Sequence, residues 1–140
     1  VIQPYRNVVD DEYESSGLKG WAEAHDAGVA FFSPLRHGLL LGKYEEPVRF
    51  EEGDHRNRFE EFRDREYLTH LRNCRDEIGR RFADHPQPVL HALIGSLLAD
   101  APGACALLGM RNPEQAEAAA QIGATLTPDQ ADWVRKLYRG

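Results

Sequence analysis

The chain contains very little sulfur. Cys74 and Cys105 are its only cysteines, and their positions form neither a CxxC pair nor a spacing typical of metal ligands. So few cysteines exclude a disulfide-based scaffold and predict a reducing compartment, the cytoplasm. Met110 is the only methionine, and the sequence starts at Val1. We therefore expect the chain to be a piece of a longer protein.

Long apolar runs and an excess of positive charge are also missing. No run approaches the ~18 apolar residues that a membrane-spanning helix needs. Seventeen Lys and Arg residues stand against 23 Asp and Glu residues, which gives a net charge of -6. Nucleic acids and anionic membranes attract basic surfaces, so neither is expected as a main partner. With 140 residues, of which 41% are hydrophobic, the chain fits a single domain over residues 1–140.

The motifs of several enzyme classes are absent. The six histidines never occur at HxxxH or HExxH spacing, and no GxSxG, P-loop or GxGxxG segment is present. These patterns serve zinc sites, serine nucleophiles and nucleotide-binding loops. No nucleophile has a base beside it in the sequence. We therefore predict neither a metal site nor a catalytic residue within the chain.

Short apolar runs alternate with amphipathic segments along the chain. Residues 29–32 and 104–108 are continuously apolar, which is typical of parallel strands buried on both faces, and residues 1–7 resemble the end of another strand. A helix is expected from Ser15 to a cap at Gly28, with Trp21 on its buried face. Further helices are expected over residues 65–83 and 88–99, and from Asn112 and Thr127. This order predicts an α/β fold with a parallel sheet and one long loop over residues 35–64.

Three segments could bind a ligand, because each follows a predicted strand and ligands bind at the carboxyl ends of parallel strands. In the first segment, Gln3 could offer its amide to a ligand carboxamide, and Tyr5 could offer its ring or hydroxyl. In the second, Phe32 could present a flat face to a ring. Ser33 and the following glycines would let the backbone approach a phosphate. Each segment could equally consist of ordinary loop and packing residues.

The third segment combines a glycine, an arginine and a helix start. Gly109 ends a predicted strand, Arg111 follows it, and Asn112-Pro113 forms a favourable helix cap. A helix N-terminus attracts anions, and an arginine adds a bidentate donor for a phosphate. The alternative is a surface arginine beside a routine cap. Together, the three segments predict a surface that binds a phosphate and a ring.

These segments resemble the C-terminal portion of aldo-keto reductases, which are NADP-dependent (β/α)8-barrel oxidoreductases. Family members carry an aromatic-Ser-Pro-Leu-x-x-Gly-Leu-Leu-x-Gly-Lys-Tyr segment, which matches Phe32 to Tyr44. They also carry Gly-Asp-x-Arg, matched at 53–56, and Gly-x-Arg-Asn-Pro-Glu-Gln, matched from Gly109 to Gln115. The resemblance covers essentially all 140 residues. It implies the C-terminal part of a TIM barrel, with about three strand–helix units, the long loop and a C-terminal helix.

The resemblance also implies roles for individual residues in binding NADPH. Gln3 would hold the nicotinamide carboxamide, and Phe32 would stack on the nicotinamide, where most members have Tyr. Ser33, Leu35 and Gly38 would contact the pyrophosphate. Gly109, Met110 and Arg111 would contact the 2′-phosphate region. Gln115 would lie near the adenine end. Members commonly have Glu-Asn where this chain has Ala118-Ala119, so hydrogen bonds to the adenine edge are not expected.

The catalytic Asp, Tyr, Lys and His of the family come from strands that precede Val1, and nothing in the chain matches them. A complete barrel typically needs ~250 residues. The implied function is NADPH-dependent reduction of an aldehyde or ketone, with this chain supplying much of the cofactor pocket. It would need the missing N-terminal barrel half or a second copy. The alternatives are an inactive barrel fragment that serves as a binding or assembly module, and a regulator resembling the potassium-channel β-subunit.

Overall fold

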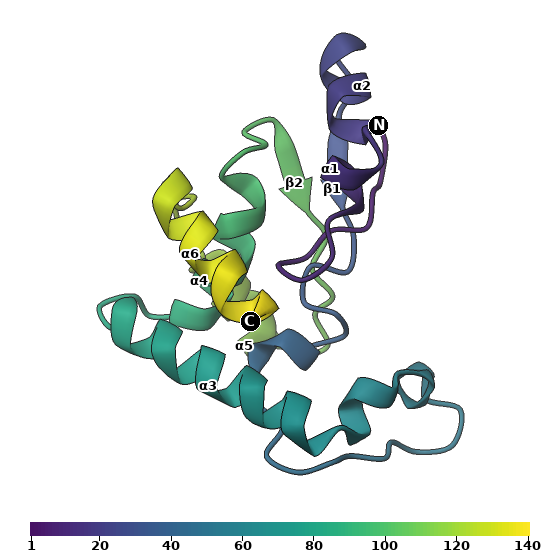
Figure 1. Cartoon of the computed structure of the whole chain (residues 1–140), viewed down its shortest axis with the longest axis vertical. Coiled ribbons are helices and arrows are strands. Elements are labelled where there is room, and N and C mark those ends of the chain that lie inside the picture. The colour runs from purple at the N-terminus through teal and green to yellow at the C-terminus, as the bar shows by residue number, and fades with distance from the viewer.

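A computed structural model describes all residues from 1 to 140. It is an α/β structure in which the strands and α2 (Leu18–Ala24) form the upper part, and α3 (Arg65–Arg81) runs along the lower edge (Figure 1). The strands are β1 (Val29–Phe31) and β2 (Ala104–Ala106). The remaining helices are α1 (Glu12–Ser15), α4 (Pro88–Leu98), α5 (Pro113–Ala120) and α6 (Pro128–Arg139), with 3-10 turns η1 (Leu39–Leu41), η2 (His55–Arg58) and η3 (Glu60–Arg63).

The sheet is parallel, as the alternation of strands and helices predicts. β1 pairs with β2 in a register that places Ala30 beside Cys105. The segment before α1 lies along the other side of β1 through two parallel bridges, Ile2 to Val29 and Tyr5 to Phe32. The expected first strand is therefore present as an extended segment with isolated bridges rather than as a regular strand. The spatial order is residues 2–6, β1, β2.

The two faces of this sheet have different surroundings. Side chains alternate along a strand, and registered neighbours point to the same side. Phe31 and its neighbours lie on the face that the helices cover, and Phe31 is fully buried. The opposite face is open and carries the side chains that follow from the register, namely Gln3, Tyr5, Phe32, Cys105 and Leu107. We call this set the open face.

A helical layer supports the sheet. α4 packs against β2 and α6, and α3 packs against both α4 and α6. Local sequence explains where these helices begin: the Thr127 side chain accepts from the Gln130 amide in a capping box, and the Asn112 side chain caps α5 by accepting from the Gln115 amide. The helix over 65–83 is confirmed, and it buries Leu68, Leu71, Cys74 and Ile78. None of the helices is long and apolar enough to cross a membrane.

The expectations for the second helix are wrong in two respects. α2 ends at Ala24 and is capped by His25 rather than by Gly28. Trp21 is 48% exposed, and its ring stacks on His25 at a centroid distance of 4.5 Å. Ala22 is the residue of this helix that is buried. Helical spacing identifies the residues that share one apolar face of the helix. It does not show which of these residues the core covers.

A buried arginine connects the start of the chain to the region before β2. The Arg6 side chain, only 1% exposed, pairs with Asp11 at 2.9 Å and with Asp100 at 3.0 Å, and it donates to the Leu97 carbonyl at 3.0 Å. Its guanidinium also lies 4.9 Å from the centre of the Phe31 ring. A buried charge needs such partners to offset the loss of hydration. Arg6 therefore fixes the segment before α1 against the helical layer.

The long loop has a small core of its own. Tyr44, Phe50 and Phe62 pack edge to face, with ring centroids 5.0 to 6.2 Å apart. Arg56 lies over Phe50 at 3.8 Å and forms a bidentate pair with Asp54. The loop projects from the start of α3 at the lower right of Figure 1. The part of the chain that lacks sequence periodicity is thus ordered by aromatic packing.

Candidate functional site

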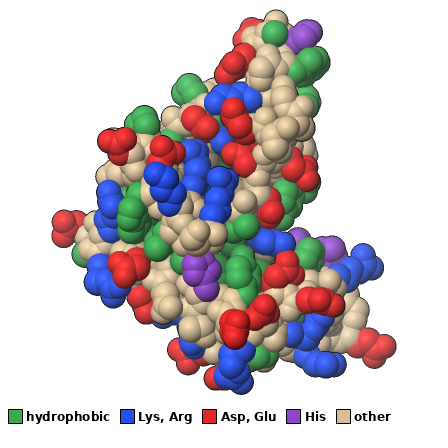
Figure 2. Space-filling view, in the orientation of Figure 1, with side chains coloured by type: hydrophobic (Ala, Val, Ile, Leu, Met, Phe, Trp, Pro, Cys, Tyr) green, Lys and Arg blue, Asp and Glu red, His purple; other side chains and the backbone are tan.

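The carboxyl ends of the strands lie at one edge of the sheet, next to the open face. Gln3 is exposed there, and the Phe32 and Leu107 side chains are each 43% exposed. Figure 2 shows the surface hollowed on the right, between the upper part with α2 and the long loop below. An exposed aromatic ring and an exposed apolar side chain on one face of the sheet, with an amide on the same face, suit a ligand that has a flat ring and a polar substituent.

Phe32 is oriented by its neighbour on the adjacent segment. The Tyr5 and Phe32 rings meet edge to face, with centroids 5.3 Å apart and planes at 69°. The sequence singled out both residues, but only the strand register brings them together. Phenylalanine has no polar group, so no hydrogen bond can fix the Phe32 ring. The contact with Tyr5 therefore sets the orientation of the exposed Phe32 ring.

The loop that follows Phe32 has an unusual backbone. Ser33, Arg36 and His37 have positive φ angles of 56°, 47° and 57°, and Gly38 has a φ of 82°. Non-glycine residues rarely adopt such angles, and they cluster at functional sites. The amide N–H groups of Ser33, Leu35 and His37 donate no backbone hydrogen bond. Free backbone amides in a turn with left-handed residues can bind an anion.

The hydroxyl of Ser33 is shielded from solvent. Its oxygen is buried and has no hydrogen-bond partner, and the same is true of the Arg36 Nε and Tyr67 hydroxyl atoms. Leu35 is half-buried, and its carbonyl accepts from the Gly38 amide at 3.0 Å. The backbone of this loop, more than its side chains, is therefore available to a ligand.

The segment from Gly109 to Gln115 presents an exposed cation at the start of α5. Gly109, Met110 and Arg111 are exposed, and the Arg111 side chain takes part in none of the ion pairs of the chain. Gln115 reaches back one residue further than a capping box requires, since its Oε1 accepts from the Arg111 amide at 2.7 Å. The Arg111 side chain is thus free for an anion, while the Gln115 carbonyl oxygen is already engaged.

The Gly53-Asp54-His55-Arg56 motif is a self-contained turn. Asp54 caps η2 by accepting from the Arg56 amide at 2.9 Å, and it also pairs with the Arg56 guanidinium at 2.6 Å. These bonds lower the pKa of Asp54 to about 2, and the Arg111 charge adds to that effect. Through Asp54, the long loop lies within electrostatic reach of Arg111.

Two histidines connect the two ends of the long loop. His37 lies in the turn after β1, residues 32–38, and His55 lies in η2. The His37 and His55 rings are 4.9 Å apart, and both contact Phe59. His37 and His55 are both exposed, so these ring contacts lie at the surface of the molecule. Burial is the largest cause that lowers the pKa of His37, and the charges of His55, Arg36 and Arg56 lower it further.

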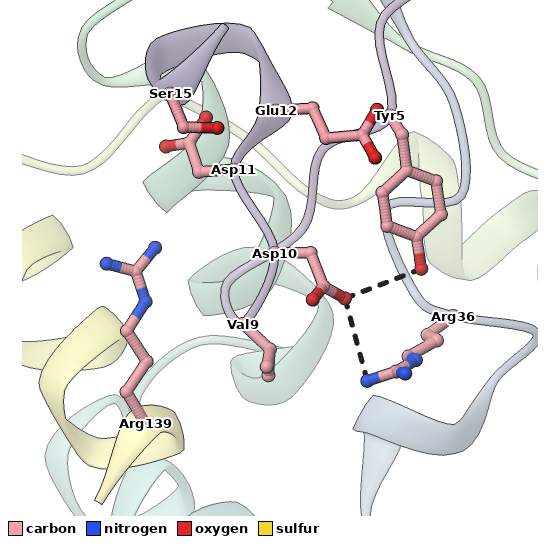
Figure 3. Close-up of a pocket in the computed structure, with 8 residues that line it drawn as sticks. All are labelled: Tyr5, Val9, Asp10, Asp11, Glu12, Ser15, Arg36 and Arg139. Carbon is pink, nitrogen blue, oxygen red and sulfur yellow. Dashed lines mark hydrogen bonds and ion pairs between the residues drawn. The ribbon is translucent and has the colours of Figure 1, made fainter.

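Sequence reasoning missed a polar cavity beside Tyr5. It has a volume of about 640 Å³ and is lined by the segment from Tyr5 to Ser15 together with Arg36 and Arg139. In Figure 3, the Tyr5 hydroxyl and the Arg36 guanidinium point to the Asp10 carboxylate from two sides, and Arg139 faces them from α6. No motif marks this cavity, because it unites residues from both ends of the chain.

The buried cysteine is not an activated nucleophile. Cys74 is buried, and burial raises the pKa of its thiol to about 11, so it stays protonated. Three or more potential metal-ligating side chains gather nowhere in the structure.

Comparison with known proteins agrees with this arrangement. The structure of a glycerol dehydrogenase, AKR11B4 from Gluconobacter oxydans, is similar with a TM-score of 0.79 and 26% identity, covering 97% of this chain and 41% of that one. The aldo-keto reductase AKR11C1 from Bacillus halodurans has a similar fold, with a TM-score of 0.62 and 18% identity over 99% of this chain and 46% of that one. The chain thus spans less than half of either structure.

Comparison with curated proteins finds no match. The model of the Aldo/keto reductase family matches residues 1–139. Within that family, the parallel strands, the helical layer and the open face correspond to part of a TIM barrel. The chain belongs to the aldo/keto reductase family.

Proposed function

We propose that this chain supplies the cofactor-binding side of an NADPH-dependent enzyme that reduces an aldehyde or ketone to an alcohol. The observation that carries the proposal is the open face: the exposed Phe32 ring and the Gln3 amide lie beside a turn with free amides at residues 33, 35 and 37. The similarity to a glycerol dehydrogenase over 97% of the chain supports chemistry between a carbonyl and an alcohol.

The residues present fit a dinucleotide. Phe32 offers a ring face to the nicotinamide, and Gln3 offers both a donor and an acceptor to its carboxamide. The free amides after Phe32 suit the pyrophosphate, with Ser33, Leu35 and Gly38 contributing backbone rather than side chains. Gly109 and Met110 border the phosphate that Arg111 binds, and Gln115 keeps one amide nitrogen for the adenine end.

The chain is expected to bind and orient, and not to transfer protons. When bound, the nicotinamide supplies a hydride to the carbonyl carbon. Phe32 and Gln3 set the plane and rotation of that ring, which determines whether the hydride points at the substrate. We assign the proton for the alcohol oxygen to a residue outside residues 1–140, because the one hydroxyl of the open face, that of Tyr5, donates to Asp10.

The open face also implies a partner. β2 has only one neighbouring strand, and Cys105 and Leu107 on its open side are exposed. We propose that the remaining strands of the barrel cover this side, and a second copy of the chain is the alternative. Both cysteines are free, which supports a reducing compartment, and we propose the cytoplasm.

An NADPH titration tests this function. We expect Arg111→Ala to weaken NADPH binding by roughly 10- to 100-fold, because a hydrogen bond to a charged group is lost. Binding of NADH, which lacks the 2′-phosphate, should change little. Arg80→Ala is the matched control, since Arg80 is an exposed arginine of α3 paired with Glu77. NADPH fluorescence of the purified protein gives the dissociation constants.

Two results would contradict the proposal. If the wild-type protein binds neither NADPH nor NADH, the open face is not a cofactor site, and an inactive binding or assembly module becomes the better explanation. If Arg111→Ala and Arg80→Ala bind NADPH equally well, Arg111 does not contact the 2′-phosphate.

A further inference from the structure

The exposed ring of Phe32 depends on a single aromatic neighbour. Tyr5 is the only aromatic residue whose ring contacts it, edge to face, with ring centroids 5.3 Å apart. Phe32 has no hydroxyl that could anchor the ring by a hydrogen bond. A ring that is 43% exposed and has no polar anchor can rotate unless a neighbour restrains it.

Tyr5 is itself held at both ends. Its backbone is bridged to Phe32 in the parallel register, and the Arg6 amide donates to the Phe32 carbonyl at 3.3 Å. Its hydroxyl donates to Asp10 Oδ2 at 3.5 Å, which is long for a hydrogen bond. Burial raises the pKa of Tyr5, so the hydroxyl stays protonated and remains a donor.

Asp10 is a fixed acceptor rather than a mobile surface group. Asn7 donates to it from Nδ2 at 3.3 Å, and the Asn7 Oδ1 accepts from the amides of Val9 and Asp10 at 2.9 Å. Arg36 approaches the same carboxylate at 3.5 Å and pairs on its other side with Glu61 at 2.6 Å. Figure 3 shows Tyr5 and Arg36 converging on Asp10.

We propose that Tyr5 is a positioning residue that fixes the plane of the Phe32 ring for stacking on the nicotinamide, with Asp10 and Arg36 as its anchor. The inference rests on the proposed function. Tyr5, Asp10 and Arg36 also line the polar cavity beside the open face. The proposal therefore gives this cavity a role in cofactor binding.

The opposite side of the sheet provides a matched control. Tyr13 and Phe31 meet with almost the same geometry, 5.0 Å and 70°, but both are buried under the helical layer. Their contact contributes to the core and lies on the face turned away from the proposed cofactor. Changes at Tyr13 should therefore alter stability without altering Phe32.

The first experiment needs no cofactor. In protein with isotope-labelled phenylalanine, Phe32→Leu identifies the Phe32 ring signals by NMR. We expect Tyr5→Leu to move these signals toward those of a freely rotating ring, because the ring current of Tyr5 is lost. Tyr5→Phe keeps the ring and removes the hydroxyl, so a smaller shift is expected. Tyr13→Phe should leave the signals unchanged.

The second experiment measures NADPH binding by the same variants. An edge-to-face pair of this kind predicts a roughly 2- to 12-fold higher dissociation constant for Tyr5→Leu, a smaller increase for Tyr5→Phe and no change for Tyr13→Phe. Melting temperatures of all variants, with Tyr13→Leu added, separate this effect from loss of stability, since Tyr13→Leu loses the buried ring contact with Phe31 and should lower the melting temperature without weakening binding.

Each outcome decides the inference. Unchanged Phe32 signals in Tyr5→Leu overturn it, as does equal NADPH binding when the signals have moved. If the signals move but the wild-type protein binds no NADPH, the proposed function fails and the assigned role fails with it, while the contact between Tyr5 and Phe32 stands.

Discussion

Gly42 shows how a single residue lets the turn after β1 approach α3. Its φ angle is 66°, and a Cβ atom there would lie 2.5 Å from the Leu71 carbonyl oxygen and 3.0 Å from the Arg75 Cβ. The Gly42 carbonyl accepts from Arg75 at 3.0 Å. Both the backbone conformation and the space therefore require glycine. The turn that carries the free amides is held against a rigid helix at this point.

We expect Gly42→Ala to lower the free energy of unfolding by about 2–4 kcal/mol, because backbone strain and overpacking add. Gly53→Ala is the matched control: its φ is 86°, but no atom lies within 4 Å of the added methyl. That variant should lose only about 1 kcal/mol through strain. Urea unfolding of both variants measures the difference, and equal losses would mean that the contact with α3 relaxes freely.

At the scale of elements, the long loop and the turn after β1 are coupled through histidine. His37 prefers to be neutral in the folded protein because burial and the charges of His55, Arg36 and Arg56 lower its pKa, against a smaller opposing effect of Asp54. The folded state thus binds fewer protons than the unfolded state. The contact between His37 and His55 contributes its full stability above about pH 6.5, and this is lost as pH falls through the lower folded-state pKa.

This coupling predicts that residues 45–63 become less protected in acid. Hydrogen exchange of their amides, corrected for intrinsic rates, should rise more between pH 7.5 and 5.5 than exchange in α4. His37→Phe keeps an aromatic contact with Phe59 and removes the titrating group, so its loop should show no such dependence. The same pH dependence in wild-type and variant proteins would rule out His37 as the cause.

Elements with a local signal were predictable from sequence, and contacts between distant elements were not. The apolar run of β1 and the caps at Asn112 and Thr127 are decided by neighbouring residues, so they are confirmed closely. The pairing of Tyr5 with Phe32 depends on strand register, and that of His37 with His55 depends on how the long loop folds back. The predicted binding residues were single positions, whereas the groups that orient them came from elsewhere in the chain.

For the whole molecule, the main feature is the difference between the two faces of the sheet. The helical layer lies against one face, while the other exposes Phe32, Leu107 and Cys105. Exposed apolar side chains beside an unpaired strand edge favour association with further strands. Each side of the sheet has one cysteine. Cys74 lies in the helical layer, and Cys105 lies on the open face.

Thiol labelling can therefore measure whether the open face is covered. In this chain alone, Cys105 should react with a thiol reagent within minutes, while Cys74 should react only on unfolding, since it is buried and its pKa is raised to about 11. Cys105→Ser should abolish the fast reaction. Protection of Cys105 in the native assembly would show that other strands or a second copy cover it, and fast labelling there would contradict the proposed partner.

The Arg6 connection has a consequence for the time course of synthesis. Arg6 and Asp100 are separated by 94 residues. Ribosomes add about 5–20 residues per second, so Arg6 waits on the order of 5–20 s before its partner has been made. During that interval Arg6 has only Asp11 as an acidic partner, and the helical layer beneath its segment is missing. The nascent chain is therefore a natural client for chaperones that shield early segments until late ones arrive.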